Sequence, residues 1–362
     1  MMISQEALNL KITQPENMSY ILLKLKEKEL WSMYVHSCKV YDFYHTWYYH
    51  SLERSGEPIL FVFQHGETII AIPLLRRPIM GTQLYDCTSV YGYAGPISNV
   101  DFNELDDSTM DNFKQSFLNF LEEGKNVSVF TRLHPLINHE TLLNKFGGIF
   151  DNGKTIAIDL QVSLDEQRKQ YRRQYRSKIR QLREKGYYLK IGDSKSEVQE
   201  FVKIYNANMS RVKAESYYHF DEKYFLDMLG SIDFESELLL LYHGGEITAG
   251  AFVVYSNNLM QFHLAATHDK FLNEGPMKLL VDEATLLGRE RGMNYLHLGG
   301  GVGGREDSLF EFKAGFSNKH LSFKTWRYVA DEDAYEELVK THSNTSAPSS
   351  NFFPLYRESV NF

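Results

Sequence analysis

The chain has 362 residues, of which 43% are hydrophobic and 14% aromatic, so it is long for one core and comfortable for two domains. Its two cysteines, Cys38 and Cys87, belong to no C-x-x-C or Cys/His cluster, which argues against a disulfide framework or a zinc site. No apolar run approaches the roughly 18 to 20 residues of a membrane span, and the N-terminus lacks the charged-then-apolar order of a signal peptide. We therefore expect a soluble, cytoplasmic protein.

The first part of the chain has the pattern of an α/β unit. Residues 18–37 predict an opening helix. Residues 59–75, ILFVFQHGETIIAIPLL, predict a β-hairpin, because two apolar runs flank a short Gly-Glu turn. Residues 120–130 predict the end of a helix, which Gly124 terminates, and then a strand.

Residues 168–185 are strongly basic. They carry nine Lys or Arg and one Glu, so this segment has a charge of +8 and the rest of the chain −16. Its apolar positions recur at helical spacing: Tyr171, Tyr175, Ile179 and Leu182. This spacing predicts one helix that ends at Gly186, with the arginines on its other faces. The segment is either a solvated charged face or a surface for a polyanion such as a nucleotide, tRNA or an acidic lipid headgroup.

The second part of the chain repeats the plan of the first. Residues 238–254 align without a gap to the first hairpin, and residues 287–298 repeat the order of helix end, glycine (Gly292) and strand. The alternative explanation is that all β-hairpins have similar sequences. Two similar segments in the same order favour duplication of one domain. The predicted regions are two α/β (α+β) domains, 1–162 and 163–332, and a tail, 333–362. In the tail, residues 341–351 have the composition of a linker, and residues 352–357 are apolar enough to dock on the body.

A glycine run, Gly299–Gly304, follows the last strand of this repeat and has five glycines in six positions. It satisfies G-x-G-x-x-G, the pattern of a dinucleotide-binding turn, but no further βαβ unit follows to complete such a sheet. We therefore reject dinucleotide binding. The run instead predicts a sharp strand end that forms the floor of a substrate site or a lid over it, with a surface loop as the alternative. A short helix capped by Asp307 or Ser308 should follow.

The strand end LGGG and the segment LFEFKAGF (309–316) resemble the C-terminal signature of the Fem-type (FemABX) transferases and of the related FemAB-like GNAT acyltransferases. Further segments resemble that family in its own order: YGYAGPI (91–97), FTRLHPL (130–136), TIAIDL (155–160), the basic segment, and FVKIYNANMSRVKAESYYHF (201–220). The resemblance covers most of residues 20–330. It implies two GNAT-like domains in tandem, each a mixed central sheet flanked by helices, with a degenerate first domain and a catalytic second one. It also implies transfer of an acyl group from a high-energy donor to an amine.

The resemblance allows two donors, acetyl-CoA (or another acyl-CoA) and an aminoacyl-tRNA. An ordinary GNAT domain binds the CoA pyrophosphate on a glycine-rich loop before a helix. The matching loop here is Asn273, Glu274, Gly275, Pro276 and Met277. Because it has one glycine of the usual pair, a plain helix cap is the alternative. The long helical hairpin of some tRNA-dependent Fem enzymes is absent, since only one helix fits between 163 and 190, and this favours acyl-CoA.

The family's F-K-x-x-F motif places a lysine near the acyl group. By match this is Lys313, which would stabilise the developing oxyanion, with a solvated surface lysine as the alternative. His263 is the candidate base, because it leaves the apolar face of its strand; a structural histidine and substrate-assisted proton transfer are the alternatives. The candidate substrate-binding residues are Arg211, Tyr217, Tyr218, Gly300, Gly301, Arg305, Asp307 and Phe312. No metal is expected.

The leading hypothesis is an N-acyltransferase that moves an acyl group, most simply acetyl from acetyl-CoA, to an amine of a cell-envelope or polysaccharide precursor. An amino-sugar nucleotide or a peptidoglycan peptide would be such an acceptor. One alternative is an aminoacyl-tRNA-dependent transferase of the peptidoglycan bridge, with tRNA bound at residues 168–185. The other is a degenerate GNAT pair that binds a ligand without catalysis.

Overall fold

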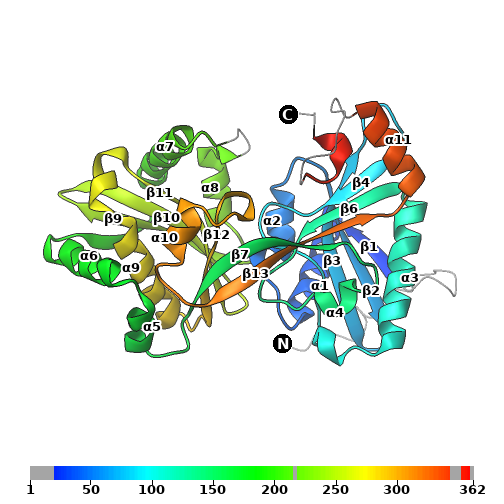
Figure 1. Ribbon diagram of the computed structural model, residues 1–362, viewed down its shortest axis with the longest axis horizontal. Helices are drawn as coiled ribbons and strands as arrows, with labels where there is room; N and C mark the ends of the chain where they lie inside the picture. The colour runs from blue at the N-terminus through cyan, green and yellow to red at the C-terminus, as the bar shows by residue number, and fades with distance from the viewer. Residues whose placement is uncertain (1–19, 215–217, 343–351, 359–362) are drawn as a thin grey trace.

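The structure, a computed structural model, describes residues 20–214, 218–342 and 352–358 and has two lobes joined by one sheet (Figure 1). The first lobe is built around strands β1 to β6 and the second around β8 to β12, with β7 and β13 running between them. Twelve of the 13 described strands follow the order β1-β2-β3-β4-β6-β13-β7-β12-β11-β10-β9-β8, and the remaining strand, β5, pairs with β3. The predicted mixed α/β class is confirmed, with both halves contributing to a continuous sheet.

The elements of the first part of the chain are β1 (Tyr20–Lys24), α1 (Lys28–Ser37), α2 (Trp47–Ser51), β2 (Glu57–His65), β3 (Thr68–Pro78), β4 (Tyr85–Thr88), β5 (Ile97–Ser98), α3 (Asp107–Glu123), β6 (Asn126–Arg132), α4 (Glu140–Leu143) and β7 (Ile149–Asp159). Those of the second part are α5 (Leu164–Gln170), α6 (Arg173–Glu184), β8 (Tyr188–Gly192), α7 (Lys195–Arg211), α8 (Glu222–Leu229), β9 (Glu235–His243), β10 (Glu246–Ser256), β11 (Leu259–Thr267), α9 (Met277–Glu290), β12 (Tyr295–Gly300), α10 (Ser308–Lys313), β13 (His320–Val329) and α11 (Glu332–His342).

The two lobes have the same strand plan. In the first lobe, the edge strand β1 and the hairpin β2–β3 precede β4, which pairs in parallel with β6, the strand after helix α3. In the second lobe, the edge strand β8 and the hairpin β9–β10 precede β11, which pairs in parallel with β12, the strand after helix α9. The last strands are exchanged: β7, from the first part, pairs with β12, and β13, from the second, pairs with β6. β7 and β13 also pair with each other, which ties the lobes together. Their exchange places the end of the first part inside the sheet of the second lobe.

Both predicted hairpins are present, because their signals are local. β2 pairs with β3 and β9 pairs with β10, and the turns use glycines with positive φ, among them Gly66 (59°) and Gly245 (82°). The two predicted helix ends are also present. Gly292 takes a φ of 69° after α9, whereas after α3 the left-handed residue is Lys125 (50°) and Gly124 stays right-handed.

The prediction of a helix over residues 18–37 is wrong for the described residues before Lys28, which form a strand and a short 3-10 turn. Residues Tyr20–Lys24 form β1, which pairs antiparallel with β2, and α1 begins only at Lys28. Tyr20 stacks on Phe61 with ring centroids 5.0 Å apart, and its hydroxyl donates to Glu123 at 2.8 Å. Pairing at the sheet edge therefore overrides the local helical preference.

The prediction of one basic helix between residues 163 and 190 is also wrong, because the segment breaks at Tyr171 and Arg172, where ψ is 138° at both residues. The Arg172 amide donates to the Gly315 carbonyl at 2.8 Å instead of continuing the helix. The predicted apolar face is nevertheless confirmed, since all four of its residues are buried: Tyr171, Tyr175, Ile179 and Leu182.

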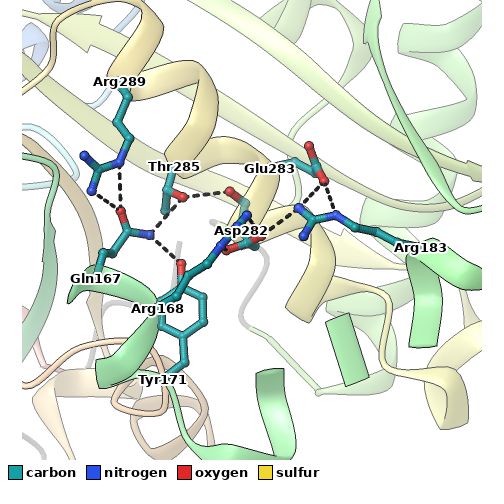
Figure 2. Close-up of polar contacts among 8 residues, drawn as sticks. All are labelled: Gln167, Arg168, Tyr171, Arg183, Asp282, Glu283, Thr285 and Arg289. Atoms are coloured by element: carbon teal, nitrogen blue, oxygen red, sulfur yellow. Dashed lines mark hydrogen bonds and ion pairs between the residues drawn. The ribbon is translucent and has the colours of Figure 1, made fainter. Parts of the chain in front are cut away.

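Polar contacts fasten α5 and α6 to α9 (Figure 2). The buried carboxylate of Asp282 accepts from Arg168 (2.7 and 3.1 Å) and from Arg183 (2.7 Å). Arg289 donates to the carbonyls of Leu160 (2.8 Å) and Val162 (2.7 Å), directly after β7. Part of the basic segment thus neutralises acids of its own domain and fixes the connection that follows β7.

Helices cover both faces of the sheet in each lobe. Each lobe has its own cluster of buried hydrophobic residues, and another such cluster joins the two lobes. In the second lobe, α6 and α9 pack on one sheet face and α7 and α8 on the other. The cluster between the lobes combines Phe43 and Tyr49 with Phe225 and Phe252. The C-terminal segment docks on the first lobe as predicted, with Tyr356 only 2% exposed, whereas the predicted linker lies mostly outside the described residues.

Candidate active site

The central strands of the second lobe stop pairing where the glycine run begins. β11 and β12 are parallel neighbours only over Leu259–Gln261 and Tyr295–His297. β11 then continues to Thr267 beside β10, while β12 has a bulge between His297 and Gly299 and remains paired with β7. In the described residues no pairing joins the two strands beyond this point, so backbone groups at the strand ends can serve other partners.

The glycine run has steric reasons for its composition. Gly299 takes a φ of 73°, and a Cβ atom on Gly300 would lie 2.7 Å from the Lys154 carbonyl oxygen. On Gly301 such an atom would lie 2.1 Å from the carbonyl oxygen of Arg305. Close backbone approach therefore explains the glycines without a dinucleotide, in line with the rejection of that function.

Lys313 lies at the end of α10, which Asp307 caps by accepting from the amides of Leu309 (3.1 Å) and Phe310 (3.0 Å). The Lys313 ammonium donates to the Gly300 carbonyl at 2.6 Å. Burial lowers the pKa of Lys313 to about 8, while the Asp307 charge acts in the opposite direction. In the part of the chain that the structure describes, no carboxylate lies within ion-pair distance of Lys313.

Tyr93, from the YGYAGPI segment of the first part, reaches the same place. A Cβ atom on Gly299 would lie 3.3 Å from both the Tyr93 hydroxyl and the Lys313 Nζ. A hydrogen bond from the Gly300 backbone also reaches the Tyr93 hydroxyl, whose pKa burial raises to about 12. Tyr93 therefore remains a neutral phenol, and the site combines a lysine of the second lobe with a tyrosine of the first.

The loop Asn273–Met277 lies beside this site. Gly275 takes a φ of 64° at the end of a 3-10 turn, and α9 begins at Met277 after Pro276. The Lys278 ammonium lies 5.8 Å from the Phe312 ring centroid and 3.0 Å from the position of a Cβ on Gly275. The structure thus brings the predicted donor loop and the F-K-x-x-F motif together. Glu274 is tied to Lys185 at 3.1 Å, and Asn273 is exposed.

His263 lies elsewhere, in the aromatic cluster between the lobes. Its Nε2 contacts the Tyr224 hydroxyl at 2.8 Å and its Nδ1 contacts the Tyr44 hydroxyl at 3.3 Å. Burial lowers its pKa to about 3. Because both nitrogens have partners and the ring resists protonation, this geometry argues against His263 as the base.

The remaining candidate residues have mixed positions. Arg211 pairs with Asp269 at 3.1 Å, so its guanidinium is already engaged. Tyr218 faces Tyr91 with ring centroids 5.7 Å apart, whereas Tyr217 lies outside the described residues. Arg305 is exposed and donates to the Val302 carbonyl at 3.2 Å. Asp307, as the α10 cap, has a structural role.

A buried polar network contacts His297 of β12, and it was not predicted from the sequence. Asp42, fully buried, accepts from Ser256 (2.8 Å) and His134 (3.0 Å) and also from Gln261. Burial alone would raise the pKa of Asp42, but these hydrogen bonds and the His134 charge hold it below its usual value. Gln261 in turn contacts His297 at 2.8 Å. These residues come from distant segments with no shared motif, so only the fold brings them together.

Comparison with known proteins agrees with this geometry. Residues 169–314 match the family model of the acetyltransferase (GNAT) domain. In structure the chain is similar to FemX, with a TM-score of 0.68 and 13% identity over 88% of this chain and 99% of that chain. It is also similar to L-PGS from Bacillus licheniformis (TM-score 0.56, 15% identity, 84% of this chain and 93% of that chain).

A further similar structure is the C-terminal domain of a putative lysylphosphatidylglycerol synthetase from Agrobacterium fabrum (TM-score 0.51, 16% identity, 80% of this chain and 89% of that chain). A search of curated protein sequences found no match. Among the described residues, no helix is long and apolar enough to cross a bilayer, and no cluster of three metal-ligating side chains occurs. Residues 169–314 therefore match a GNAT domain, and the chain as a whole has the fold of FemX.

Proposed function

We propose that the protein is an N-acyltransferase that transfers an acyl group, most simply acetyl from acetyl-CoA, to an amine of a cell-envelope or polysaccharide precursor. One observation carries the proposal: a partly desolvated ammonium, Lys313, is held by the Gly300 carbonyl beside the Tyr93 hydroxyl, at the open end of two parallel strands in a GNAT domain. The Lys313 ammonium can only donate hydrogen bonds and has no carboxylate partner among the described residues. It can therefore stabilise an oxygen that gains negative charge during the reaction.

The reaction needs few groups from the protein. The amine nitrogen attacks the acyl carbon, the bond from that carbon to the leaving sulfur or oxygen breaks, and an amine proton ends on the leaving group. Lys313 would stabilise the oxyanion formed in the first step, and Tyr93 is close enough to Gly299 to add a second hydrogen bond.

The acyl-CoA donor is supported by the loop before α9. The first turn of a helix attracts phosphate through its amide groups and its dipole; in α9 the Lys278 and Leu279 amides already donate to the Gly275 (3.2 Å) and Pro276 (2.9 Å) carbonyls, so the Met277 amide would make the contact. Gly275 brings the chain into α9 with a left-handed φ, and Lys278 at the start of that helix adds a positive charge near Phe312. A pyrophosphate bound there would leave the thioester free to extend toward Lys313.

The test is an assay with labelled acetyl-CoA and a panel of amines: amino-sugar nucleotides and a muropeptide with a free lysine amine. We expect transfer to at least one acceptor, and Lys313→Ala should lower kcat roughly 100-fold or more, the usual loss for an oxyanion donor. Lys319→Ala is the matched control, since its ammonium contacts Tyr295 and Asp159 and, among the described residues, has no contact with the proposed site. Absence of both transfer and acetyl-CoA binding would refute the acetyl-CoA version.

A second candidate function is aminoacyl transfer from tRNA. Two observations favour it: the similarity to FemX and the exposed arginines of α6. The similarity to a putative lysylphosphatidylglycerol synthetase adds a lipid to the acceptors worth testing beside peptidoglycan peptides. If neither donor stabilises the protein against heat, a non-catalytic binding module becomes the better description, because a tight ligand raises the melting temperature by mass action.

A further inference from the structure

His297 is a buried histidine of β12 whose tautomer the surrounding network determines. It is 1% exposed, and its Nδ1 lies 2.8 Å from the Gln261 Oε1. The Gln261 amide NH₂ donates to Asp42, and an ionised carboxylate can only accept. The oxygen of the Gln261 amide must therefore face His297, and Nδ1 must carry the imidazole proton.

The other nitrogen of His297 is consequently a bare acceptor. Its Nε2 has no hydrogen-bond partner among the described residues, and leaving such a group unpaired in a protein interior costs about 1–3 kcal/mol. Burial and the His134 and Lys313 charges lower the pKa of His297 to about 3, while the Asp42 charge acts in the opposite direction. The ring therefore stays neutral and keeps its acceptor lone pair at every physiological pH.

This acceptor lies at the proposed acyl-transfer site. His297 is two residues before Gly299, and its ring centroid is 4.9 Å from that of Tyr93, in an edge-to-face contact. Tyr93 and Lys313 meet at Gly299, as described above. The groups around the imidazole are thus a donor-only ammonium, a phenol, and the His134–Asp42 pair behind it.

A donor and an acceptor at one place match an acyl group under attack by an amine. The adduct has an oxyanion and an N–H on the same carbon, so Lys313 suits the first and a bare imidazole nitrogen suits the second. We propose that His297 Nε2 accepts a hydrogen bond from the reacting amine and directs its lone pair at the acyl carbon, with Gln261 and Asp42 as positioning residues. This inference rests on the proposed function.

In this role His297 does not take the proton, which passes to the leaving group. The Tyr93 ring must shift for the amine to reach Nε2, and a shift that keeps its hydroxyl near Gly299 preserves the hydrogen bond to the oxyanion. The flanking glycines Gly92 and Gly95 have φ angles of 115° and 105° and pack against Tyr44 and His139, so the backbone of this turn is fixed and the movement is that of the Tyr93 side chain alone.

The kinetic test compares His297→Phe with a matched control, His50→Phe. His50 is also fully buried, its Nδ1 lies 3.0 Å from the Thr46 carbonyl oxygen, and its Nε2 is likewise unpaired, but it packs against Trp31 in the first lobe. We expect kcat/KM for the amine to fall about tenfold or more in His297→Phe, since tenfold corresponds to about 1.4 kcal/mol. His297→Gln should recover part of the loss, and His50→Phe should leave the rate unchanged.

Two results would overturn the proposal: equal rates for His297→Phe and the wild type, or equal losses for His297→Phe and His50→Phe. The thermal shift produced by acetyl-CoA should be the same in all variants, because the donor loop is not altered. If the wild type transfers no acyl group to any acceptor, the proposed function fails, and the following measurement still decides whether the acceptor is built into the fold.

That measurement is ¹⁵N NMR of protein labelled at histidine, with the His297 signals assigned as those lost in His297→Gln. We expect Nε2 to have the shift of an unprotonated nitrogen from about pH 5 to pH 9, and Gln261→Leu to produce a mixture of tautomers. A proton on Nε2 in the wild type would overturn the proposal whatever the activity.

Discussion

Burial of the Lys313 ammonium lowers the stability of the folded protein, and the same burial suits the proposed acyl transfer. Its ammonium is removed from water and has one carbonyl as its described hydrogen-bond acceptor. The pKa is about 8 in the folded chain against 10.5 for the ordinary side chain, so folding works against the charged form. Below pH 8 the folded protein bears this cost, and the cost disappears as the pH rises from about 8 to 10.5.

Lys313→Met should therefore stabilise the protein at pH 7 while it abolishes transfer. We expect a gain of about 1–2 kcal/mol in the free energy of unfolding, because the lost hydrogen bond to Gly300 offsets part of the relieved desolvation. Urea unfolding measured at pH 7 and pH 10 checks this, and the gain should shrink at the higher pH. A loss of stability at pH 7 would mean that the ammonium is solvated.

The residues of the site differed in how far the sequence could predict them. Lys313 followed from the resemblance of its short helix to the Fem-type signature. His263, chosen from strand alternation, shows the limit of that reasoning, because alternation says which face a side chain takes but not what fills that face. Tyr93 lies in a segment that resembles the family, but neither its role nor that of His297 could be read from the sequence, since both roles come from contacts between segments some two hundred residues apart.

At the scale of elements, the basic segment divides into two sets of arginines. Arg168 and Arg183 pair with Asp282, and Arg172 pairs with Glu311 of α10 at 2.5 Å. Besides the paired Arg183, the exposed arginines of α6 are Arg173, Arg176 and Arg180, of which the last has a loose pair with Glu184 at 3.8 Å. Their spacing of three and four places them on one stripe of the helix. The paired arginines thus serve packing within the second lobe, and binding of a polyanion stays a prediction for the exposed stripe alone.

Neutralising that stripe tests the tRNA alternative. The triple variant Arg173→Gln, Arg176→Gln, Arg180→Gln should weaken tRNA binding and lower the slope of log affinity against log salt, if phosphates contact these side chains. The control changes three lysines that already pair with carboxylates: Lys195, Lys203 and Lys223. Equal binding by both triple variants would remove the basis for tRNA at α6.

At the scale of the whole molecule, the C-terminal segment completes the first lobe. The fully buried Asp86 accepts from Arg357 at 2.5 Å and from Tyr356 at 3.1 Å, besides Arg77 at 2.8 Å. The Tyr356 hydroxyl also contacts Ser128 of β6 at 2.8 Å. A carboxylate without access to water depends on such partners.

A chain that ends at residue 351 should therefore lose about 2–4 kcal/mol of unfolding free energy, because Asp86 stays buried after losing two of its partners, Tyr356 and Arg357. A chain that ends at residue 358 keeps the docked segment and is the control, with no change expected. Calorimetry or urea unfolding measures both, and an unchanged stability in the shorter chain would show that Arg77 alone satisfies Asp86.

The sequence by itself determined the local units and their repetition: the two hairpins, the helix ends after them, and the buried stripe of the basic segment. Each depends on periodicity or on a turn within a few residues. Only the tertiary structure decided that β1 is a strand, that the basic segment breaks at Tyr171, and that β7 and β13 change lobes. These features depend on pairing with distant partners. The site follows the same division, because its lysine belongs to a local motif, whereas the tyrosine and the histidine network reach it only through the packing of one lobe on the other.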